Sequence, residues 1–275
     1  MDKKAFHKKK KFGQHFLTSD QVPRRMISGS DIDKNCGVLE IGPGLGILTA
    51  ELLNVAGKVV SVEIDDELIP ILNKRFDGNE QFKLIKDDIL KIDLSVLIRE
   101  EFQDMPVCVC ANLPYYITTP IVMTLLESEL PFSSITVMVQ KEVASRLCAA
   151  KGSPEYGAVT VAVNYYSSVK RLFIVPAGAF SPPPKVDSAV IIFRPHGANI
   201  RRASDEKLFF DIVKSAFSQR RKTLLNALYP LFSERFSKEM LSSLLDCQGF
   251  SGQTRGECLS VDDFMRIVDK INKYK

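Results

Sequence analysis

The stretch CANLPYY, residues 110–116, places an amide, a proline and two tyrosines directly after an apolar run that predicts a buried strand. The Asn112 side-chain oxygen can accept one hydrogen bond from the exocyclic amine of a planar base, and the backbone carbonyl of Leu113 or Pro114 can accept the other. Holding both hydrogens favours the tetrahedral nitrogen that a nucleophilic amine needs in its transition state. Pro114 fixes its own φ and removes an N–H, and Tyr115 offers a flat surface for the base. These residues indicate group transfer to a base amine without a general base, because the amine proton becomes acidic only after transfer.

Earlier strand ends carry groups that suit an adenosyl ligand. The sequence EIGPGLG, residues 40–46, is a glycine-rich turn that lets the backbone approach a ligand closely. Its GxGxG spacing differs from the GxGxxG of a dinucleotide site and resembles the first motif of S-adenosylmethionine-dependent methyltransferases; a purely structural turn is the alternative. Glu63, 21 residues after Gly42, stands where an acid can bind both ribose hydroxyls. Asp87 and Asp88 follow the next strand and are placed to hold the adenine amino group.

A sheet must position these groups. Between residues 37 and 140 short β-rich runs alternate with helical patterns, which predicts a doubly wound, mostly parallel α/β sheet with ligands beyond the carboxyl ends of its strands. Residues 158–166, AVTVAVNYY, fit a helix or a strand by period alone, and 186–193 predict a closing strand. Apolar residues after 196 recur at helical spacing. The patterns predict three parts: a basic flexible tail (1–11), a doubly wound α/β domain (12–196) and a small C-terminal all-helical domain (197–275). The resemblance of the glycine motif implies that the second part is a Rossmann-like class I methyltransferase domain.

The charge distribution indicates an anionic partner. The chain of 275 residues has a net charge of +4. Lysines crowd residues 3–11, and a second basic cluster consists of Arg220, Arg221 and Lys222. Blocks of like charge often bind nucleic acid, and a solvated tail is an equal alternative for the first block. For the second cluster we prefer phosphate binding to a role at the end of an amphipathic helix.

Cysteine usage and apolar patterns exclude several classes of protein. The chain has six cysteines and three histidines, with no CxxC pair, so neither a disulfide framework nor a metal site is expected. Cys108 and Cys110 are expected to face the core from one side of a strand. No signal peptide is evident, and no apolar run approaches the roughly 18 residues of a membrane span. We expect a monomer in the reducing cytoplasm, without membrane contact.

Several motifs follow one another along the chain. They are KKFGQHFL (10–17), EIGPGLGILT (40–49), VEID (62–65), the Asp88 region, ANLPYYITTP (111–120), VQKEVASRL (139–147), FSPPPKVDSAV (180–190) and AFSQRRKTLLNAL (216–228). Together they closely resemble the ribosomal RNA adenine dimethyltransferase family, from about residue 11 to the end. NLPY with FSPPPKVDS is highly specific and is similar to the bacterial small-subunit (KsgA-type) branch. The resemblance implies S-adenosylmethionine-dependent dimethylation of two adjacent adenines near the 3′ end of 16S ribosomal RNA, within an assembling 30S-type particle during ribosome biogenesis.

The same resemblance implies site residues. Its cofactor contacts fall on His15, Leu17, Gly42, Glu63, Asp88 and Asn112. Tyr115 and Phe180 are implied to bracket the target base. The family usually reads QNFL where this chain has His15 in QHFL; a histidine can still donate a hydrogen bond to the cofactor. A phenylalanine is more often a core residue, but the stiff proline run 182–184 after Phe180 predicts its exposure at the site.

Three other functions remain open at this point. The first is a large-subunit ribosomal RNA adenine methyltransferase of the macrolide-resistance type, which NLPY and the motif at 216–228 disfavour. The second is an RNA-binding assembly factor that keeps a methyltransferase fold without catalysis, which the intact acids and NLPY disfavour. The third is a DNA adenine methyltransferase, since related motifs recur there.

Overall fold

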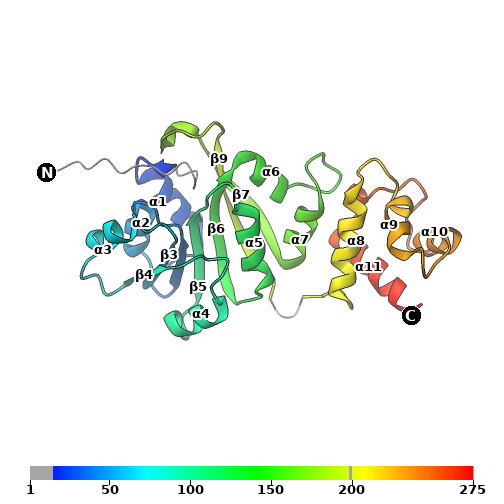
Figure 1. Ribbon diagram of the computed structural model, residues 1–275, viewed down its shortest axis with the longest axis horizontal. Coiled ribbons are helices and arrows are strands. Elements are labelled where there is room, and N and C mark those ends of the chain that lie inside the picture. The colour runs from blue at the N-terminus through cyan, green and yellow to red at the C-terminus, as the bar shows by residue number, and fades with distance from the viewer. Residues whose placement is uncertain (1–14, 198–199, 275) are drawn as a thin grey trace. The chain divides into compact units, whose positions relative to one another are not determined.

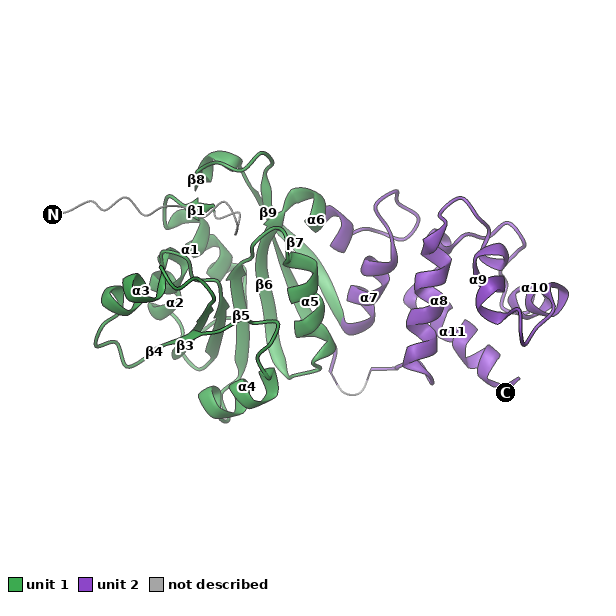
Figure 2. Cartoon of the chain, viewed as in Figure 1, with its two compact units in different colours: residues 1–144, 167–195 green, residues 145–166, 196–275 purple. Residues whose placement is uncertain are grey.

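The computed structural model describes residues 15–197 and 200–274, which fall into two compact units (Figure 2). The first unit holds the chain up to residue 144 together with 167–195, and the second holds 145–166 and the chain from 196 onward. The expected basic tail, 1–11, lies outside the described residues. Among the described residues, the helices are all too short or too polar to cross a membrane.

A seven-stranded sheet forms the centre of the first unit (Figure 1). Its strands are β2 (Gly37–Ile41), β3 (Lys58–Glu63), β4 (Phe82–Lys86), β5 (Val107–Asn112), β6 (Phe132–Gln140), β7 (Ser167–Val175) and β9 (Ser188–Pro195). Their order is β4-β3-β2-β5-β6-β9-β7; pairing is parallel from β4 to β6 and antiparallel at β9 and β7. The predicted doubly wound, mostly parallel α/β fold is confirmed. The chain reverses its direction of winding between β2 and β5, the point at which such sheets bind ligands.

Helices alternate with these strands. They are α1 (Gln21–Ser28), α2 (Ile47–Leu53), α3 (Ile69–Arg75), α4 (Leu94–Phe102), α5 (Thr118–Glu127) and α6 (Lys141–Leu147). Packing is tight enough to require glycine at one point, because a Cβ at Gly37 would lie 2.1 Å from the Phe102 ring. Cys108 and Cys110 are fully buried in one apolar cluster with Met26 of α1, which confirms the predicted core role of this cysteine pair.

A two-stranded sheet joins the start of the described chain to the FSPPPKVDS segment. β1 (Phe16–Leu17) pairs antiparallel with β8 (Phe180–Ser181), which follows the 3-10 turn η2 (Ala177–Ala179). The Thr18 N–H donates a 3.0 Å hydrogen bond to the Ala179 carbonyl and extends this pairing. Two motifs separated by more than 160 residues are therefore neighbours in space.

The second unit is helical. Its elements are α7 (Ala158–Tyr166), α8 (Glu206–Ser218), α9 (Leu224–Phe232), α10 (Lys238–Asp246), η3 (Gly256–Cys258) and α11 (Val261–Asn272). The ambiguous segment at 158–166 is thus a helix. Tyr165 of α7 packs on Phe209 of α8 with ring centroids 4.5 Å apart, and Phe209 contacts Phe264 of α11. These contacts place 145–166 with the helical unit, whereas the sequence-based division kept that segment in the first domain.

Candidate active site

A cavity of about 250 Å³ lies at the carboxyl ends of the parallel strands. The glycine turn after β2, the ends of β3 and β5, the loop after β4 and the segment at 15–17 line it. The structure brings together there all the residues predicted to contact the cofactor or hold the amine: His15, Leu17, Gly42, Glu63, Asp88, Asn112, Leu113, Pro114 and Tyr115. Gly42, Glu63, Asp88 and Asn112 were predicted from strand ends, and the parallel topology explains why they converge. His15 and Leu17 were implied by the family resemblance alone.

The glycine turn needs glycine for two different reasons. Gly42, Gly44 and Gly46 all have left-handed backbone conformations, with φ of 66°, 59° and 77°. A Cβ on Gly42 would meet no atom within 4 Å, so this position leaves open space at the cavity wall. A Cβ on Gly46 would lie 2.7 Å from the Phe76 ring. The first glycine therefore keeps room beside the cavity, and the last allows α2 to pack.

Glu63 is held by the backbone around it. Its Oε1 accepts hydrogen bonds of 2.9 Å from the N–H groups of Ile64 and Asp65, and its Oε2 accepts a longer one, 3.4 Å, from Gly44. Burial raises the pKa of this carboxyl, while the three N–H donors oppose the rise. Glu63 thus ties the end of β3 to the glycine turn and lines the cavity with a carboxyl whose position is already fixed.

Glu40 is a cavity residue to which the sequence analysis gave no role. It is fully buried, and its Oε2 accepts hydrogen bonds from Ser61 Oγ at 2.6 Å and Thr49 Oγ1 at 2.7 Å. Its Oε1 has no hydrogen-bond partner within the described ranges. Burial raises the pKa of Glu40 to about 7. The available signal was an acid inside the otherwise apolar strand GVLEI, beside a serine on the next strand.

Asp88 organises the loop after β4. Its Oδ1 accepts a 3.1 Å hydrogen bond from the Leu90 N–H, and its Oδ2 lies 3.6 Å from Lys91 Nζ. The neighbouring Asp87 accepts a 2.7 Å hydrogen bond from the Asp88 N–H. Asp88 lines the cavity with Ile89 and retains acceptor capacity, so its predicted contact with the adenine amine stays a prediction.

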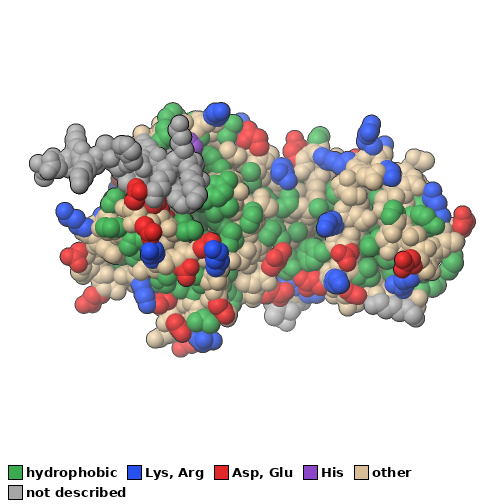
Figure 3. Space-filling model, in the orientation of Figure 1, with side chains coloured by type: hydrophobic (Ala, Val, Ile, Leu, Met, Phe, Trp, Pro, Cys, Tyr) green, Lys and Arg blue, Asp and Glu red, His purple; other side chains and the backbone are tan. Residues whose placement is uncertain are grey.

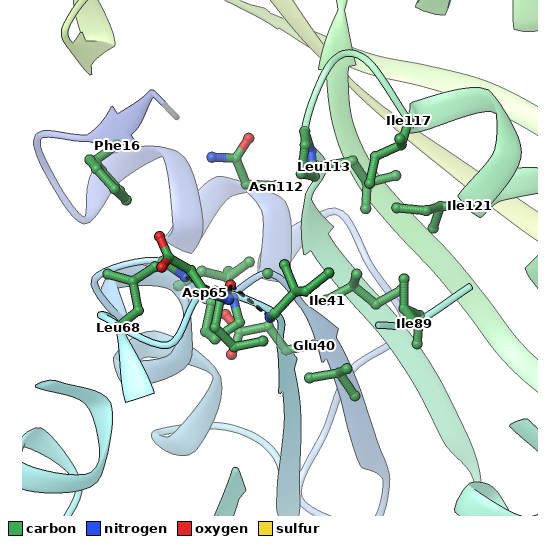
Figure 4. A pocket seen from close by; sticks show the side chains of 18 of the residues that line it. Phe16, Glu40, Ile41, Asp65, Leu68, Ile89, Asn112, Leu113, Ile117 and Ile121 are labelled. Carbon is green, nitrogen blue, oxygen red and sulfur yellow. Dashed lines mark hydrogen bonds between the residues drawn. The ribbon is translucent and has the colours of Figure 1, made fainter. Parts of the chain in front are cut away.

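The polar groups of the NLPY turn differ in their hydrogen bonding. Figure 4 shows the Asn112 carboxamide standing between Phe16 on one side and Leu113 on the other. Neither this carboxamide nor the Leu113 carbonyl has a hydrogen-bond partner in the part of the chain that the structure describes. The Pro114 carbonyl, in contrast, accepts from Ile117 N–H at 3.2 Å and from Thr118 Oγ1 at 3.0 Å. Of the two carbonyls left open by the sequence, the structure thus favours Leu113 as an amine acceptor.

Tyr115 is fixed from two directions. Its hydroxyl lies 2.7 Å from Ser188 Oγ, and the His15 imidazole stacks on its ring with centroids 5.6 Å apart and an interplanar angle of 27°. His15 Nδ1 donates a 2.8 Å hydrogen bond to the Pro182 carbonyl. Burial raises the pKa of Tyr115, so the hydroxyl keeps its proton. The QHFL, NLPY and FSPPPKVDS motifs therefore meet at one ring.

Phe180 corrects an expectation. Its side chain is 3% exposed, packs in the apolar cluster with Leu17 and Val175, and is absent from the cavity lining. The expected exposure is wrong because Phe180 belongs to β8, where pairing with Leu17 turns its side chain inward and leaves Ser181 exposed. Stacking of Phe180 on a target base stays a prediction that requires a local rearrangement.

The three residues of the basic cluster, which follows α8, differ in their contacts. Arg220 Nη2 donates to the Pro154 carbonyl and, at 3.0 Å, to the Tyr156 carbonyl, with Glu257 Oε2 3.8 Å away. Arg221 and Lys222 are exposed, and their side chains have no hydrogen-bond or ion-pair partner in the described ranges. Arg220 thus holds a loop of the helical unit, whereas its two neighbours are available to an external anion.

Among the described residues, no group of three or more His, Cys, Asp or Glu side chains is placed to hold a metal ion. The described part of the site has three features: a glycine-rich wall, the buried carboxyl of Glu40 with one unpartnered oxygen, and two unpartnered acceptors beside an anchored tyrosine. This set suits binding of an adenosyl ligand next to a base amine.

The chain is similar to a known protein family and to several known proteins. The family described as ribosomal RNA adenine dimethylase matches residues 5–273. Ribosomal RNA small subunit methyltransferase A from Streptococcus thermophilus is 41% identical over 275 residues, which cover 99% of this chain and 95% of the relative. A dimethyladenosine transferase structure from Plasmodium falciparum is 26% identical, with a TM-score of 0.82 and coverage of 94% of this chain and 98% of the other. The 23S rRNA methyltransferase ErmE shares the fold, at 23% identity, a TM-score of 0.72 and coverage of 94% and 99%. The resemblance seen in the motifs is thereby confirmed, and the chain belongs to the ribosomal RNA adenine dimethylase family.

Proposed function

We propose that this chain dimethylates the N6 amines of two adjacent adenines near the 3′ end of small-subunit (16S) ribosomal RNA, with S-adenosylmethionine as methyl donor. One observation carries the proposal: two acceptors that have no partner among residues 15–197 and 200–274, the Asn112 carboxamide oxygen and the Leu113 carbonyl, belong to residues that line the same cavity as the glycine turn. The cavity wall suits an adenosyl ligand, and the rim suits an amine. These are the two reactants of an N-methyl transfer.

The N6 amine of adenine is a poor nucleophile because its lone pair is delocalised into the ring. Two acceptors that bind its two hydrogens favour the tetrahedral nitrogen and therefore stabilise the transition state more than the ground state. Asn112 supplies the first acceptor and Leu113 the second, since the Pro114 carbonyl is engaged by Ile117 and Thr118. Tyr115 supports the extruded base by stacking. No side chain has to remove a proton before transfer.

The residues of the cavity fit the methyl donor. When bound, S-adenosylmethionine supplies an electrophilic methyl group on a sulfonium sulfur. Within the described chain Glu40 Oε1 is a buried acceptor without a donor, and Gly42 leaves open space at the cavity wall. We assign Glu63 to the ribose hydroxyls and Asp88 to the adenine amine, as acids at these strand ends can accept such hydrogen bonds.

His15 and Leu17 complete the cofactor side of this proposal. Both line the cavity, His15 from just before β1 and Leu17 from β1 itself. Because His15 Nδ1 already donates to the Pro182 carbonyl, Nε2 is the ring nitrogen left for the cofactor, and in the neutral ring it accepts a hydrogen bond. The donation to the cofactor expected from the sequence would need a second proton on the ring.

We assign RNA phosphate binding to the helical unit. Arg221 and Lys222 are exposed and unpaired within the described residues, while Arg220 is engaged internally. On the face shown in Figure 3, Lys and Arg side chains are interspersed with Asp and Glu side chains. With a net charge of +4, local clusters rather than the overall field must attract the RNA. We propose that a monomer acts in the cytoplasm on an assembling 30S-type particle.

Labelled S-adenosylmethionine distinguishes this function from its alternatives. The protein is incubated with undermethylated small subunits and, separately, with naked large-subunit RNA, and the labelled nucleotides are mapped. We expect two dimethylated adjacent adenines in the small-subunit RNA alone. Label in the large-subunit RNA would support the macrolide-resistance type of activity. Cofactor binding without any label would support an assembly factor.

A further inference from the structure

We infer that Ser188 is a positioning residue for methyl transfer, because its hydroxyl fixes the Tyr115 ring in the orientation that receives the target base. This inference rests on the proposed function, in which Tyr115 stacks on that base. Ser188 lies outside the residues that line the cavity and acts only through Tyr115.

The contact between the two residues is short and protected. Tyr115 Oη and Ser188 Oγ lie 2.7 Å apart, and Ser188 is fully buried. Because Ser188 is fully buried, water cannot replace a lost partner at its hydroxyl, so removal of the Tyr115 hydroxyl leaves Ser188 Oγ unsatisfied. The hydrogen bond is therefore expected to persist throughout the reaction.

The position of Ser188 is set by the sheet. It is the first residue of β9, opposite Gln140 of β6 on one side and Val175 of β7 on the other. The preceding residue, Asp187, accepts hydrogen bonds from Ala177 N–H through Oδ1 at 3.1 Å and from Lys141 N–H through its carbonyl at 3.0 Å. The anchor hydroxyl thus stands on backbone that is tied to both neighbouring strands.

Tyr115 is only half-buried, so packing alone does not fix its ring. It precedes Tyr116, which lines the same cavity and is 57% exposed. A tyrosine ring can turn about two side-chain torsions, and its stacking surface points correctly in only one combination of them. The bond to Ser188 fixes the far end of the ring, and the stacked His15 limits its rotation.

A double-mutant cycle tests this role. Ser188→Ala and Tyr115→Phe each remove one hydroxyl of this hydrogen bond. Tyr115→Phe keeps the aromatic ring on which the base stacks, and it alters a side chain that is only half-buried. In single turnover at saturating S-adenosylmethionine and small-subunit RNA, each variant should transfer methyl groups roughly two- to tenfold more slowly, the range for one hydrogen bond. Because both changes remove the same interaction, the double variant should be no slower than either single variant.

Two further measurements separate positioning from general damage. Thr136→Val is the matched control, because Thr136 on β6 is fully buried and its hydroxyl has no partner among the described residues. It should transfer at the wild-type rate. RNA with 2-aminopurine at the target position reports base stacking, and its fluorescence should be quenched less by Ser188→Ala than by the wild type. The affinity for S-adenosylmethionine should be unchanged in all variants.

The possible outcomes are distinct. A wild-type rate for Ser188→Ala, equal quenching, or a double variant whose loss is the product of the two single losses would overturn the positioning role. Failure of the proposed function would be seen elsewhere, as a wild-type protein that does not methylate small-subunit RNA or a Tyr115→Ala variant with full activity. If Ser188→Ala does not fold, methyl transfer by Tyr115→Phe at the wild-type rate would by itself overturn the inference.

Discussion

Glu40 on β2 and Ser61 on β3 are register partners, and the Ser61 hydroxyl donates a 2.6 Å hydrogen bond to Glu40 Oε2. The hydroxyl of Thr49 donates to the same oxygen at 2.7 Å. Neutral donors compensate only part of the desolvation of a buried carboxylate, and burial raises the pKa of Glu40 to about 7. The cavity thus contains a carboxyl whose charge changes near neutral pH.

This pair predicts a pH dependence of stability. Glu40 is protonated in both states below pH 4.5, the unfolded value; as the pH rises toward 7, the unfolded chain releases the proton first, which favours unfolding. The folded state should therefore lose about 3 kcal/mol across this window. Glu40→Gln does not titrate, so its free energy of unfolding, measured by denaturant titration at pH 4.5 and 8 without cofactor, should lack that loss. Equal pH dependence in both proteins would show that Glu40 is not a buried titrating group.

The acid at the end of β3 should control cofactor affinity. Glu63→Ala should weaken S-adenosylmethionine binding by roughly 1.5–3 kcal/mol, the scale of a hydrogen bond to a charged group. Isothermal calorimetry measures this, with circular dichroism as the check on folding. Asp66→Ala is the control, because Asp66 is an exposed acid outside the cavity lining. Unchanged affinity in a folded Glu63→Ala protein would remove Glu63 from the site.

Alanine substitutions at two glycines distinguish the cost of a left-handed backbone conformation from the cost of close packing. Gly46 and Gly78 have similar φ, 77° and 73°, but a Cβ at Gly46 would lie 2.7 Å from Phe76, whereas at Gly78 it would meet nothing within 4 Å. Gly78→Ala should destabilise by about 1 kcal/mol through its left-handed conformation. Gly46→Ala should lose a further 1–3 kcal/mol or so from overpacking. Equal melting temperatures for the two variants would mean that the Phe76 contact is not rigid.

The basic cluster after α8 should respond unevenly to neutralisation. Arg221→Gln and Lys222→Gln should each lower the slope of log affinity against log salt for small-subunit RNA by up to about 1. Arg220→Gln should instead reduce the stability of the helical unit by about 1 kcal/mol, since Arg220 holds two loop carbonyls at a half-exposed site. Filter binding over a salt series, with thermal melts of each variant, measures both effects. The same slope change in all three variants would assign Arg220 to RNA as well.

Local patterns were sufficient to predict the parallel core and the polar groups at its strand ends. Continuous apolar runs such as GVLEI and KVVSVE define strands, and parallel topology brings their ends together. The helix at 158–166 could not be predicted, because its period fits both structures and its contact with Phe209 decides between them. The membership of 145–166 in the helical unit likewise follows from tertiary packing.

The details of the site depend on partners far away in the chain. The choice of the Leu113 carbonyl over Pro114 requires knowing that Thr118 and Ile117 occupy the latter. Burial of Phe180 follows from its pairing with Leu17, which no local signal near the proline run reveals. The internal role of Arg220 depends on the carbonyls of Pro154 and Tyr156, more than 60 residues earlier.

The most direct test of the proposed mechanism concerns Asn112, the free amide at the end of β5. Asn112→Ala should slow single-turnover methyl transfer to small-subunit RNA by roughly 10²–10³ at saturating S-adenosylmethionine, as expected for one preorganised polar partner of the transition state. Binding of the RNA should change little, because phosphate contacts dominate it. Asn226→Ala, which removes an exposed amide in the helical unit, is the control and should keep the wild-type rate. Methyl transfer by Asn112→Ala at the wild-type rate would contradict the account and reduce the NLPY turn to a scaffold.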